Sequence, residues 1–464
     1  MVLNVSVAGD GRYAFLTEGS TAESDEIGWL DARVHVLELG TGPTPSLGAP
    51  LQSLSPSRDA AYRIVRVSGR LLTVLTDRGA PRHRLVEIDL DQPAPAHGRE
   101  VIPESPHVLQ SVRMIGGRFA AIYLRDAQQY VKVFTLTGAP VRDIEAPPVS
   151  RVFVEAGAAD SLLEVESEGY LQLPTVIQYD VTNGSTTPVF SAKSAFPMHE
   201  FLASQVWYTS RDGTRIPMFL VHRKGIALNG THPTLLFGYG ASGTSTLPGY
   251  SPDVLTWLQM GGVFAVPTMR GGGEFGRDWY ESAALERKQK TFDDFIGAAE
   301  YLIAQGYTTA ARLAIKGESN GGQLVAAVMV QRPELFAVAV PGVPQTDNLR
   351  YDRGRHRGQF GSPADFRQFS FLYAYSPLHQ VRAGTCYPAT LVTTAMNDDR
   401  SPAWMSMKFV AALQAAQACP RPVVLLARER GGHFGERTPD GAIQDAADVL
   451  LFIAKQLGMS QPPR

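Results

Sequence analysis

A glycine-rich turn in the second half of the chain contains the residues best suited to chemistry. The hexapeptide GESNGG at residues 317–322 lies between an apolar run, Leu313 to Ile315, and a helix-like stretch, Gln323 to Gln331. Glycine two residues before and two residues after Ser319 permits a sharp strand-to-helix turn, because a Cβ there would collide with neighbouring backbone. Such a turn exposes the serine hydroxyl as a nucleophile and directs the N–H of Asn320 at a developing oxyanion.

An acid follows the serine at a position that suits a catalytic triad. Asp398 and Asp399 come directly after the apolar run Ala389 to Ala395. The loop at the carboxyl end of a strand is where the triad acid of an α/β-hydrolase lies. Either aspartate could orient a histidine.

A histidine follows that acid. His433 stands in a glycine-flanked loop after the apolar run Val423 to Ala427, whereas His356 and His379 follow Ser319 but precede the acid. The glycines allow the imidazole to reach over the sheet edge. A lone loop histidine is usually a solvated surface residue, but the order serine, acid, histidine favours a triad here.

These roles define a reaction that needs no cofactor. His433 takes the proton of Ser319, the alkoxide attacks a carbonyl, and the carboxylate stabilises the imidazolium that forms. Water then hydrolyses the acyl-enzyme. The sequence has no H-E-x-x-H motif, no Cys/His cluster and no Walker-type loop, so we expect no metal and no organic cofactor.

From Arg211 onward the chain resembles the catalytic domain of the prolyl oligopeptidase family of serine peptidases (peptidase family S9). The matching segments occur in family order. They are RDGTRIPM at 211–218, GYG at 238–240, RGGGEFG at 270–276 with Trp279, the GESNGG turn, QRPELF at 331–336, YSPL at 375–378, NDDR at 397–400 and GH at 432–433.

The resemblance implies a role for each matching position. Ser319 is the nucleophile, Asp398 the triad acid and His433 the base. Tyr239 is a second oxyanion donor beside the N–H of Asn320. The implied activity is that of a serine-type oligopeptidase or endopeptidase that hydrolyses short peptides.

Two of the implied assignments have structural alternatives. Arg400 matches the arginine with which family members hold a substrate backbone carbonyl, but it could also pair with Asp399. Tyr239 could be a half-buried tyrosine at the end of the strand Thr234 to Phe237. Glycines on both sides of Tyr239 would let its ring turn into a cleft, but it is the resemblance that favours the oxyanion role over the structural one.

The amino-terminal third has a repeating strand pattern. Alternating apolar and polar residues recur at 34–39, 85–90, 131–136 and 176–181, with turn residues after each segment. Starts about 45 to 51 residues apart suit four-stranded propeller blades with one outer strand marked per repeat. A plain antiparallel sandwich is the alternative. We predict an all-β, partial β-propeller followed by a C-terminal α/β-hydrolase catalytic domain.

The chain departs from typical family members at its amino terminus. Those members have a seven-bladed propeller over the active site, whereas Met1 here falls in what looks like the middle of such a ring. We therefore expect about four blades. An open ring exposes sheet edges that invite pairing with another chain. The alternatives are a truncated gene product and an oligomer that completes the propeller.

A second departure concerns specificity. Prolyl members stack the substrate proline on a tryptophan, but no tryptophan lies between Asn348 and Tyr375. We expect weakened proline selectivity, because several pocket walls change together. The predicted substrate-binding positions are Arg400, His356, Phe360, Ser242 and Gln345. A pocket for basic side chains, as in the related oligopeptidase B group, could use Asp352 or Asp365.

Length and composition agree with two domains. The chain has 464 residues, of which 44% are hydrophobic, and its net charge is −2. We place the domains at residues 1–195 and 196–464, because Phe196-Pro197 interrupts the strand pattern. The near-neutral charge predicts no nucleic acid and no anionic membrane as partner.

Cysteine use and the first residues point to the cytoplasm. Cys386 and Cys419 are the two cysteines, too few for a disulfide framework and consistent with a reducing compartment. The start has no signal-peptide pattern, and no apolar run is long enough to cross a bilayer.

Two helices are predicted from apolar periodicity. The first includes Phe292, Phe295, Ala299 and Leu302, and Asp293 and Asp294 are expected in its first turn, where they favour its dipole. The second spans Ile443 to Leu457, and its packed face is predicted to contain Ile443, Ala446, Leu450, Ile453 and Leu457.

Three functions are consistent with these patterns. The first is a serine oligopeptidase. The second is an esterase or acyl transferase on the same triad, including peptide cyclisation, where an amine replaces water. The third is a catalytically weak remnant, motivated by the missing blades.

Overall fold

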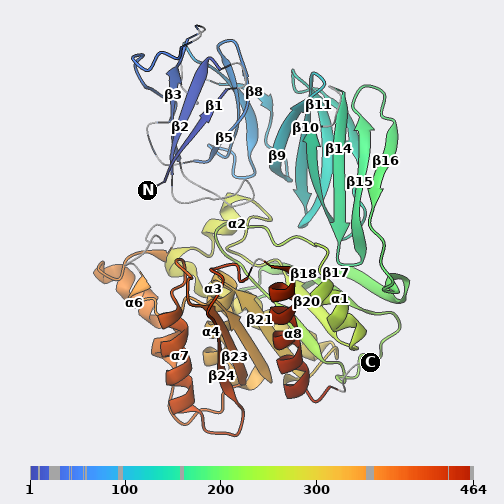
Figure 1. Cartoon of the computed structure of the whole chain (residues 1–464), viewed down its shortest axis with the longest axis vertical. Helices are drawn as coiled ribbons and strands as arrows, with labels where there is room; N and C mark the ends of the chain where they lie inside the picture. The colour runs from blue at the N-terminus through green and yellow to red at the C-terminus, as the bar shows by residue number, and fades with distance from the viewer. Residues whose placement is uncertain are drawn as a thin grey trace. The chain divides into compact units, whose positions relative to one another are not determined.

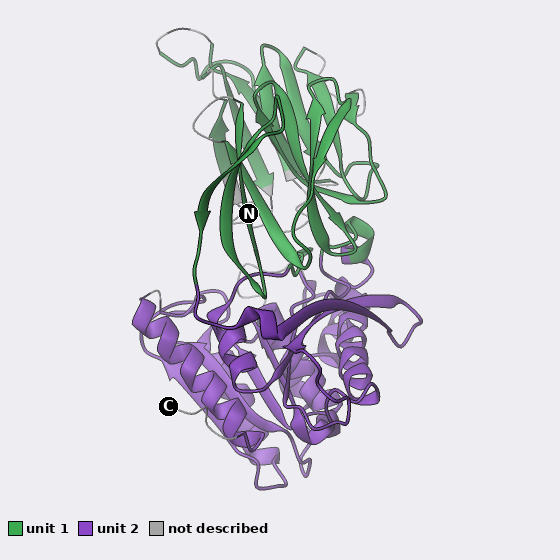
Figure 2. Cartoon of the chain, turned by 90° about the vertical axis from the view of Figure 1, so that its right-hand side faces the viewer, with its two compact units in different colours: residues 1–193, 242–247, 273–279 green, residues 194–241, 248–272, 280–464 purple. Residues whose placement is uncertain are grey.

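The chain divides into two compact units in the computed structural model. The structure describes residues 2–459 except 9–10, 20–31, 41, 43, 56, 58–59, 92–97, 157–160, 352–359 and 437. Unit 1 consists of residues 1–193 with the later segments 242–247 and 273–279, and unit 2 of residues 194–241, 248–272 and 280–464 (Figure 2).

Unit 1 is built, over its described residues, from four antiparallel sheets of four strands each (Figure 1). The strands of the first two sheets are β1 (Val2–Val7), β2 (Tyr13–Gly19), β3 (Ala32–Glu38), β4 (Gln52–Ser53), β5 (Tyr62–Ser68), β6 (Leu71–Thr76), β7 (Arg84–Asp89) and β8 (Arg99–Ile102). Those of the other two are β9 (Val108–Ile115), β10 (Arg118–Arg125), β11 (Gln128–Thr135), β12 (Pro140–Ile144), β13 (Ser150–Ala156), β14 (Leu162–Gly169), β15 (Gln172–Asp180) and β16 (Thr186–Ser191).

Apolar clusters join these sheets in chain order. Phe15 of the first sheet packs in one cluster with Leu72 of the second. Leu85 of the second packs in another with Phe119 of the third, and a further cluster joins the third sheet to the fourth. Sheets that bury their faces against successive neighbours are the blades of a propeller. The predicted propeller class is confirmed.

The repeating pattern marks a different strand from the one expected. The four periodic segments fall on β3, β7, β11 and β15, each of which has a hydrogen-bonded strand on both sides. The prediction of an outer strand is therefore wrong. The last strands alternate poorly, because β4 has only 2 residues and β16 is exposed along its length.

Unit 2 is built on one eight-stranded sheet, which helices flank on both faces (Figure 1). Its order is β17-β18-β20-β19-β21-β22-β23-β24, with antiparallel pairing at β17-β18-β20 and parallel pairing from β20 onward. The strands are β17 (Phe201–Thr209), β18 (Arg215–Arg223), β19 (Thr234–Phe237), β20 (Val263–Pro267), β21 (Leu313–Glu318), β22 (Val338–Gly342), β23 (Ala389–Ala395) and β24 (Val423–Arg428). This is the predicted α/β-hydrolase arrangement.

The helices of this half of the chain agree with the apolar patterns in most positions. They are α1 (Pro252–Gln259), α2 (Arg277–Glu281), α3 (Gln289–Ala304), α4 (Asn320–Gln331), α6 (Phe366–Ala374), α7 (Ala403–Ala416) and α8 (Pro439–Gln456). Among the described helices, none has the length and apolar character that crossing a membrane requires.

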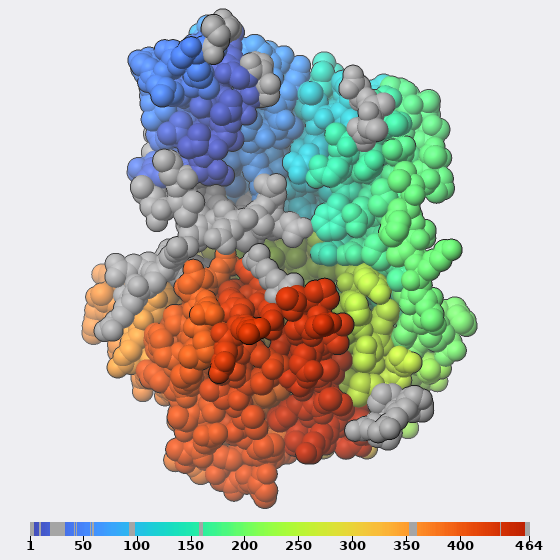
Figure 3. Space-filling view, in the orientation of Figure 1, coloured from blue at the N-terminus to red at the C-terminus, as the bar shows by residue number. Residues whose placement is uncertain are grey.

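Two expectations about these helices are wrong in part. Ile443 is 66% exposed, whereas Leu450 and Ile453 are buried as predicted, because the amino-terminal end of α8 extends past the packed surface. The C-terminal part of the chain, which includes α8, forms the orange and red surface of unit 2 in Figure 3. Asp294 is fully buried and lies beyond the first turn of α3, and its carboxylate binds the guanidinium of Arg270 at 2.6 Å.

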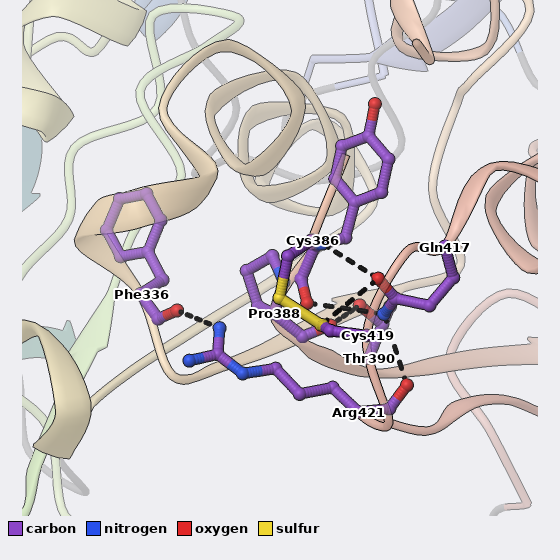
Figure 4. Close-up of a disulfide and its surroundings, with 8 residues drawn as sticks. Phe336, Cys386, Pro388, Thr390, Gln417, Cys419 and Arg421 are labelled. Carbon is purple, nitrogen blue, oxygen red and sulfur yellow. Dashed lines mark hydrogen bonds between the residues drawn. A yellow bond between two sulfur atoms is a disulfide. The ribbon is translucent and has the colours of Figure 1, made fainter. Parts of the chain in front are cut away.

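A disulfide joins Cys386 to Cys419 (Figure 4). It connects the segment before β23 to the segment after α7. Gln417 supports the same junction, because its amide accepts from the N–H of Tyr387 at 2.9 Å and donates to the carbonyl of Arg421 at 3.1 Å. The pairing removes the cysteine argument for a reducing compartment, since disulfides persist mainly in oxidising surroundings. A cytoplasmic location stays a prediction.

We expect replacement of Cys386 and Cys419 by serine to lower the free energy of unfolding by about 2–4 kcal/mol, because the bond closes a long loop. The sequence separation is 33 residues. Denaturant unfolding of the double variant against the oxidised wild type measures the change. Reduction should shift the wild type by the same amount and leave the double variant unaffected. A double variant as stable as the oxidised wild type would contradict this assignment.

Candidate active site

Ser319 lies at the sharp turn between β21 and α4. Its backbone has φ 56° and ψ −115°, a conformation that non-glycine residues rarely adopt. Its N–H donates to the carbonyl of Gly342 at 2.9 Å, and its own carbonyl accepts from the N–H of Gln323 at 3.0 Å to begin the helix. Both bonds fix the strained turn, so the serine points away from the strand that precedes it.

The glycines around Ser319 are required by close backbone packing. A Cβ on Gly317 would lie 2.4 Å from the carbonyl oxygen of Gly321 and 2.6 Å from that of Gly238. A Cβ on Gly321 would lie 2.4 Å from the same Gly238 oxygen. These separations are far below van der Waals contact. The turn therefore sits directly on the loop that follows β19.

Val343 is a strained residue that no sequence pattern singled out. It follows β22 with φ 38°, which is unfavourable for a β-branched side chain. Its N–H donates to the carbonyl of Thr393 at 2.8 Å, while the carbonyl of the preceding Gly342 accepts a hydrogen bond from the N–H of Ser319. Strain of this kind costs about 1–3 kcal/mol and clusters at functional sites. No local pattern could have found it, because the conformation is imposed by neighbouring strands.

His433 bridges Ser319 and Asp398. Its Nε2 lies 2.9 Å from the hydroxyl oxygen of Ser319, and its Nδ1 lies 2.8 Å from Oδ2 of Asp398. The side chain of Asp398 is fully buried and that of His433 nearly so. The structure thus brings together the three residues that the sequence singled out, and places Asp398 rather than Asp399 at the ring. Asp399 is exposed.

Backbone hydrogen bonds hold Asp398 in its ionised form. Oδ1 accepts from the N–H groups of Arg400 and Ser401, each at 2.8 Å. Burial opposes ionisation, but the hydrogen bonds from His433 and from these two N–H groups hold the pKa of Asp398 below its ordinary value. A carboxylate that stays charged can accept a hydrogen bond from the imidazole N–H and so fix the tautomer of the ring.

Tyr239 lies against the side chain of Asn320, the residue that follows Ser319. The side-chain amide of Asn320 donates to the phenol oxygen of Tyr239 at 3.2 Å. Tyr239 follows β19, and Gly240 after it has φ 59°, so the chain turns sharply at this point. The two residues predicted to supply oxyanion donors are therefore in contact through their side chains.

Arg400 and Phe434 lie near His433. The guanidinium of Arg400 stands 5.1 Å from the ring centre of Phe434. The ring of Phe434 packs edge-on against that of His433 at 5.3 Å and is 67% exposed. Sequence reasoning missed Phe434, although an aromatic residue directly after the candidate base was a usable signal. Such a ring can orient the arginine by a cation–π contact.

Two of the predicted specificity residues are buried in unit 2. Phe360 packs edge-on against Tyr351 at 5.7 Å. Gln345 is also buried, and among the described residues its side-chain nitrogen has no hydrogen-bond partner. An unsatisfied buried donor is costly, so this amide is available to a ligand or a water molecule. The prediction that Gln345 and Phe360 bind substrate stays open.

The other predicted specificity residues are Ser242, His356, Asp352 and Asp365. Ser242 has φ 60° and belongs to the segment that groups with unit 1. His356 and Asp352 lie outside the described residues. Asp365 caps helix α6, since its carboxylate accepts from the N–H of Arg367 at 2.8 Å. This cap gives Asp365 a structural role.

No cluster of three or more histidine, cysteine or acidic side chains that could hold a metal ion occurs in the part of the chain that the structure describes.

Comparison with known families matches both units to one family. Residues 248–460 match the model of the prolyl oligopeptidase family, and residues 1–192 match the model of the prolyl oligopeptidase N-terminal beta-propeller domain. The two matches together cover most of the chain.

Individual relatives agree. A prolyl endopeptidase from Elizabethkingia miricola is 37% identical over 402 residues, which are 85% of this chain and 57% of that protein. The dual function macrocyclase-peptidase POPB of Galerina marginata is 33% identical over 465 residues, 97% of this chain and 62% of that protein. The chain thus spans about three-fifths of the length of these relatives.

Solved structures have the same fold. A chain from a structural and mechanistic analysis of two prolyl endopeptidases superposes with a TM-score of 0.91 at 35% identity, over 99% of this chain and 66% of that one. Prolyl oligopeptidase B from Galerina marginata, bound to a 35mer hydrolysis and macrocyclization substrate, gives a TM-score of 0.91 at 30% identity, over 99% and 65%.

We expect Asp398→Asn to change how stability depends on pH. The pKa of Asp398 is lowered in the folded state, so its contribution is fully present above the ordinary aspartate pKa of about 3.9 and is lost as pH falls through the lower folded value. Urea unfolding at neutral pH and at about pH 3 measures the contribution. The difference between wild type and variant should shrink at the lower pH. Asp399→Asn, one residue away and exposed, is the control, and a difference that persists at low pH would contradict the expectation.

Proposed function

The chain belongs to the prolyl oligopeptidase family of serine peptidases, and from this we propose that it hydrolyses peptide bonds in short peptides through an acyl-enzyme on Ser319. The observation that carries the proposal is the continuous hydrogen-bonded series from Asp398 through His433 to Ser319. A nucleophile, a base and a group that orients the base are the parts that such catalysis needs.

In the acylation step, Nε2 of His433 accepts the hydroxyl proton of Ser319 while the serine oxygen attacks the substrate carbonyl. The resulting imidazolium is stabilised by the buried carboxylate of Asp398, which bonds its Nδ1–H. His433 then protonates the leaving amine, and the C–N bond breaks. In deacylation, water attacks the ester, and His433 again serves as base.

The charge that develops on the carbonyl oxygen needs donors in fixed positions. We assign this role to the phenol of Tyr239 and the backbone N–H of Asn320. The support is the proximity of the two residues, since the side-chain amide of Asn320 donates to the phenol oxygen at 3.2 Å. A single donor of this kind typically contributes about 10²–10³-fold to kcat.

Substrate selection is proposed to begin with the peptide backbone. Arg400 is the candidate for holding a substrate carbonyl, with Phe434 beneath its guanidinium. Several relatives are named prolyl endopeptidases, which supports cleavage after proline. No tryptophan lies between Asn348 and Tyr375, and its absence favours a weaker preference for proline than that of prolyl endopeptidases. Gln345 and Phe360 remain the candidates for the pocket walls.

Transfer of the acyl group to an amine is the second candidate. It is favoured by relatives at 32% and 33% identity that are named dual function macrocyclase-peptidases. The triad chemistry is unchanged, since an amine replaces water in the second step. An ester substrate would follow the same course.

The oligomeric state and location belong to the same proposal. Exposed apolar residues on β1 and β16, among them Val5, Val7 and Phe190, are surfaces on which another chain could pair. We propose an oligomer that completes the propeller, which sedimentation at several protein concentrations tests directly. A mass equal to one chain throughout would exclude it. A cytoplasmic location is retained as part of the proposal.

We expect Ser319→Ala and His433→Ala to abolish labelling by a fluorophosphonate probe and cleavage of peptide amides, whereas wild type is labelled at one site. Loss of either group should lower kcat by about 10⁴-fold or more. His379→Ala is the matched control for a histidine outside the triad. A folded wild type that is not labelled would contradict the proposal and favour a catalytically weak remnant. Mass spectrometry of the products separates hydrolysis, which adds one water, from cyclisation, which does not.

A further inference from the structure

Lys288 is a buried amine directly before helix α3, outside the proposed triad and oxyanion donors. Only 5% of its surface is exposed. Its Nζ donates to the carbonyl of Gly240 at 2.8 Å and to the hydroxyl of Thr291 at 3.3 Å. It also stands 5.9 Å from the ring centre of Phe292. The strongest of these contacts is made to the residue that follows Tyr239.

Helix α3 supports the whole turn at residues 238–240. A Cβ on Gly238 would lie 2.5 Å from the ring of Phe295, and a Cβ on Gly240 would lie 2.5 Å from the methyl group of Thr291. The hydroxyl of Thr291 in turn donates to the carbonyl of Arg270 at 2.9 Å. These contacts come from one helical face, so the turn is packed against α3. Lys288 supplies the hydrogen bond that holds its carbonyl.

Burying an amine at this position costs desolvation free energy. Burial lowers the pKa of Lys288 to about 7, while the carboxylate of Asp294 acts in the opposite direction. A hydrophobic residue of similar volume would avoid that desolvation cost. It would, however, leave the carbonyl of Gly240 buried without its donor. The hydrogen bond from Lys288 therefore fixes the orientation of the Gly240 carbonyl, which packing alone would not do.

We propose that Lys288 is a positioning residue for the oxyanion hole, which it serves by holding the Gly240 carbonyl and thereby the phenol of Tyr239. This inference rests on the proposed function. A donor contributes to catalysis only if it matches the oxyanion of the transition state and not the ground-state carbonyl. A displaced phenol should therefore lower kcat and leave KM almost unchanged.

The test is a kinetic comparison of Lys288→Met with wild type on a peptide substrate. We expect kcat to fall by about 10–100-fold with KM within about twofold, because one donor is misplaced and not removed. Lys290→Met, two residues away in the first turn of α3, is the control and should keep wild-type kcat. A Lys288→Met variant that folds and keeps wild-type kcat overturns the inference.

A double-mutant cycle with Tyr239→Phe separates positioning from general damage. If Lys288 acts through the phenol, Lys288→Met should cost less than about threefold in kcat once that phenol is absent. Equal losses in both backgrounds overturn the proposal. If Lys288→Met does not fold, the cycle is run with Lys288→Gln, which keeps a donor. Coupling to Tyr239→Phe then supports the inference and additivity overturns it.

Wild-type activity distinguishes this inference from the function on which it rests. A wild type that is neither labelled by the fluorophosphonate nor able to cleave peptides overturns the proposed function itself. An active wild type with additive variants overturns the role of Lys288 alone.

Discussion

The left-handed backbone of Ser319 is the constraint around which the site is built. An L-residue adopts this conformation only where surrounding structure compensates a cost of about 1–3 kcal/mol. The compensation here is the bond from its N–H to Gly342 and the close approach of Gly317 and Gly321 to the Gly238 carbonyl. The loop after β19 and the carboxyl end of β22 must therefore lie within contact distance of one turn. The strand order that places β19, β21 and β22 side by side satisfies this requirement.

Different elements hold the residues proposed to act with Ser319. Helix α3 packs against the turn that carries Tyr239. Oδ1 of Asp398 is fixed by two successive backbone N–H groups, so this side chain is held by the loop that contains it. His433 comes from a third loop and contacts both Ser319 and Asp398. Movement of any of these elements changes the alignment at a single hydroxyl, and supporting hydrogen bonds and packing are what hold such groups in place.

Sequence alone was sufficient where chemistry and local pattern coincide. The glycines of the GESNGG turn, the apolar runs that became β21, β23 and β24, and the order of acid and histidine led to residues that the structure places within hydrogen-bonding distance. Features set by distant contacts were out of reach. The buried pair of Asp294 and Arg270, the strain at Val343 and the bond from Lys288 depend on segments far apart in the chain. No periodicity records such contacts.

The disulfide encloses the segment from which the acid comes. Because Cys386 and Cys419 lie on either side of β23, Asp398 and α7, this stretch is a covalent ring within the chain. A protease that cuts one peptide bond between the two cysteines would leave Ser319 and His433 on different fragments. The disulfide would still join those two fragments. Nicked protein would therefore keep the parts of its site in a single molecule until the bond is reduced.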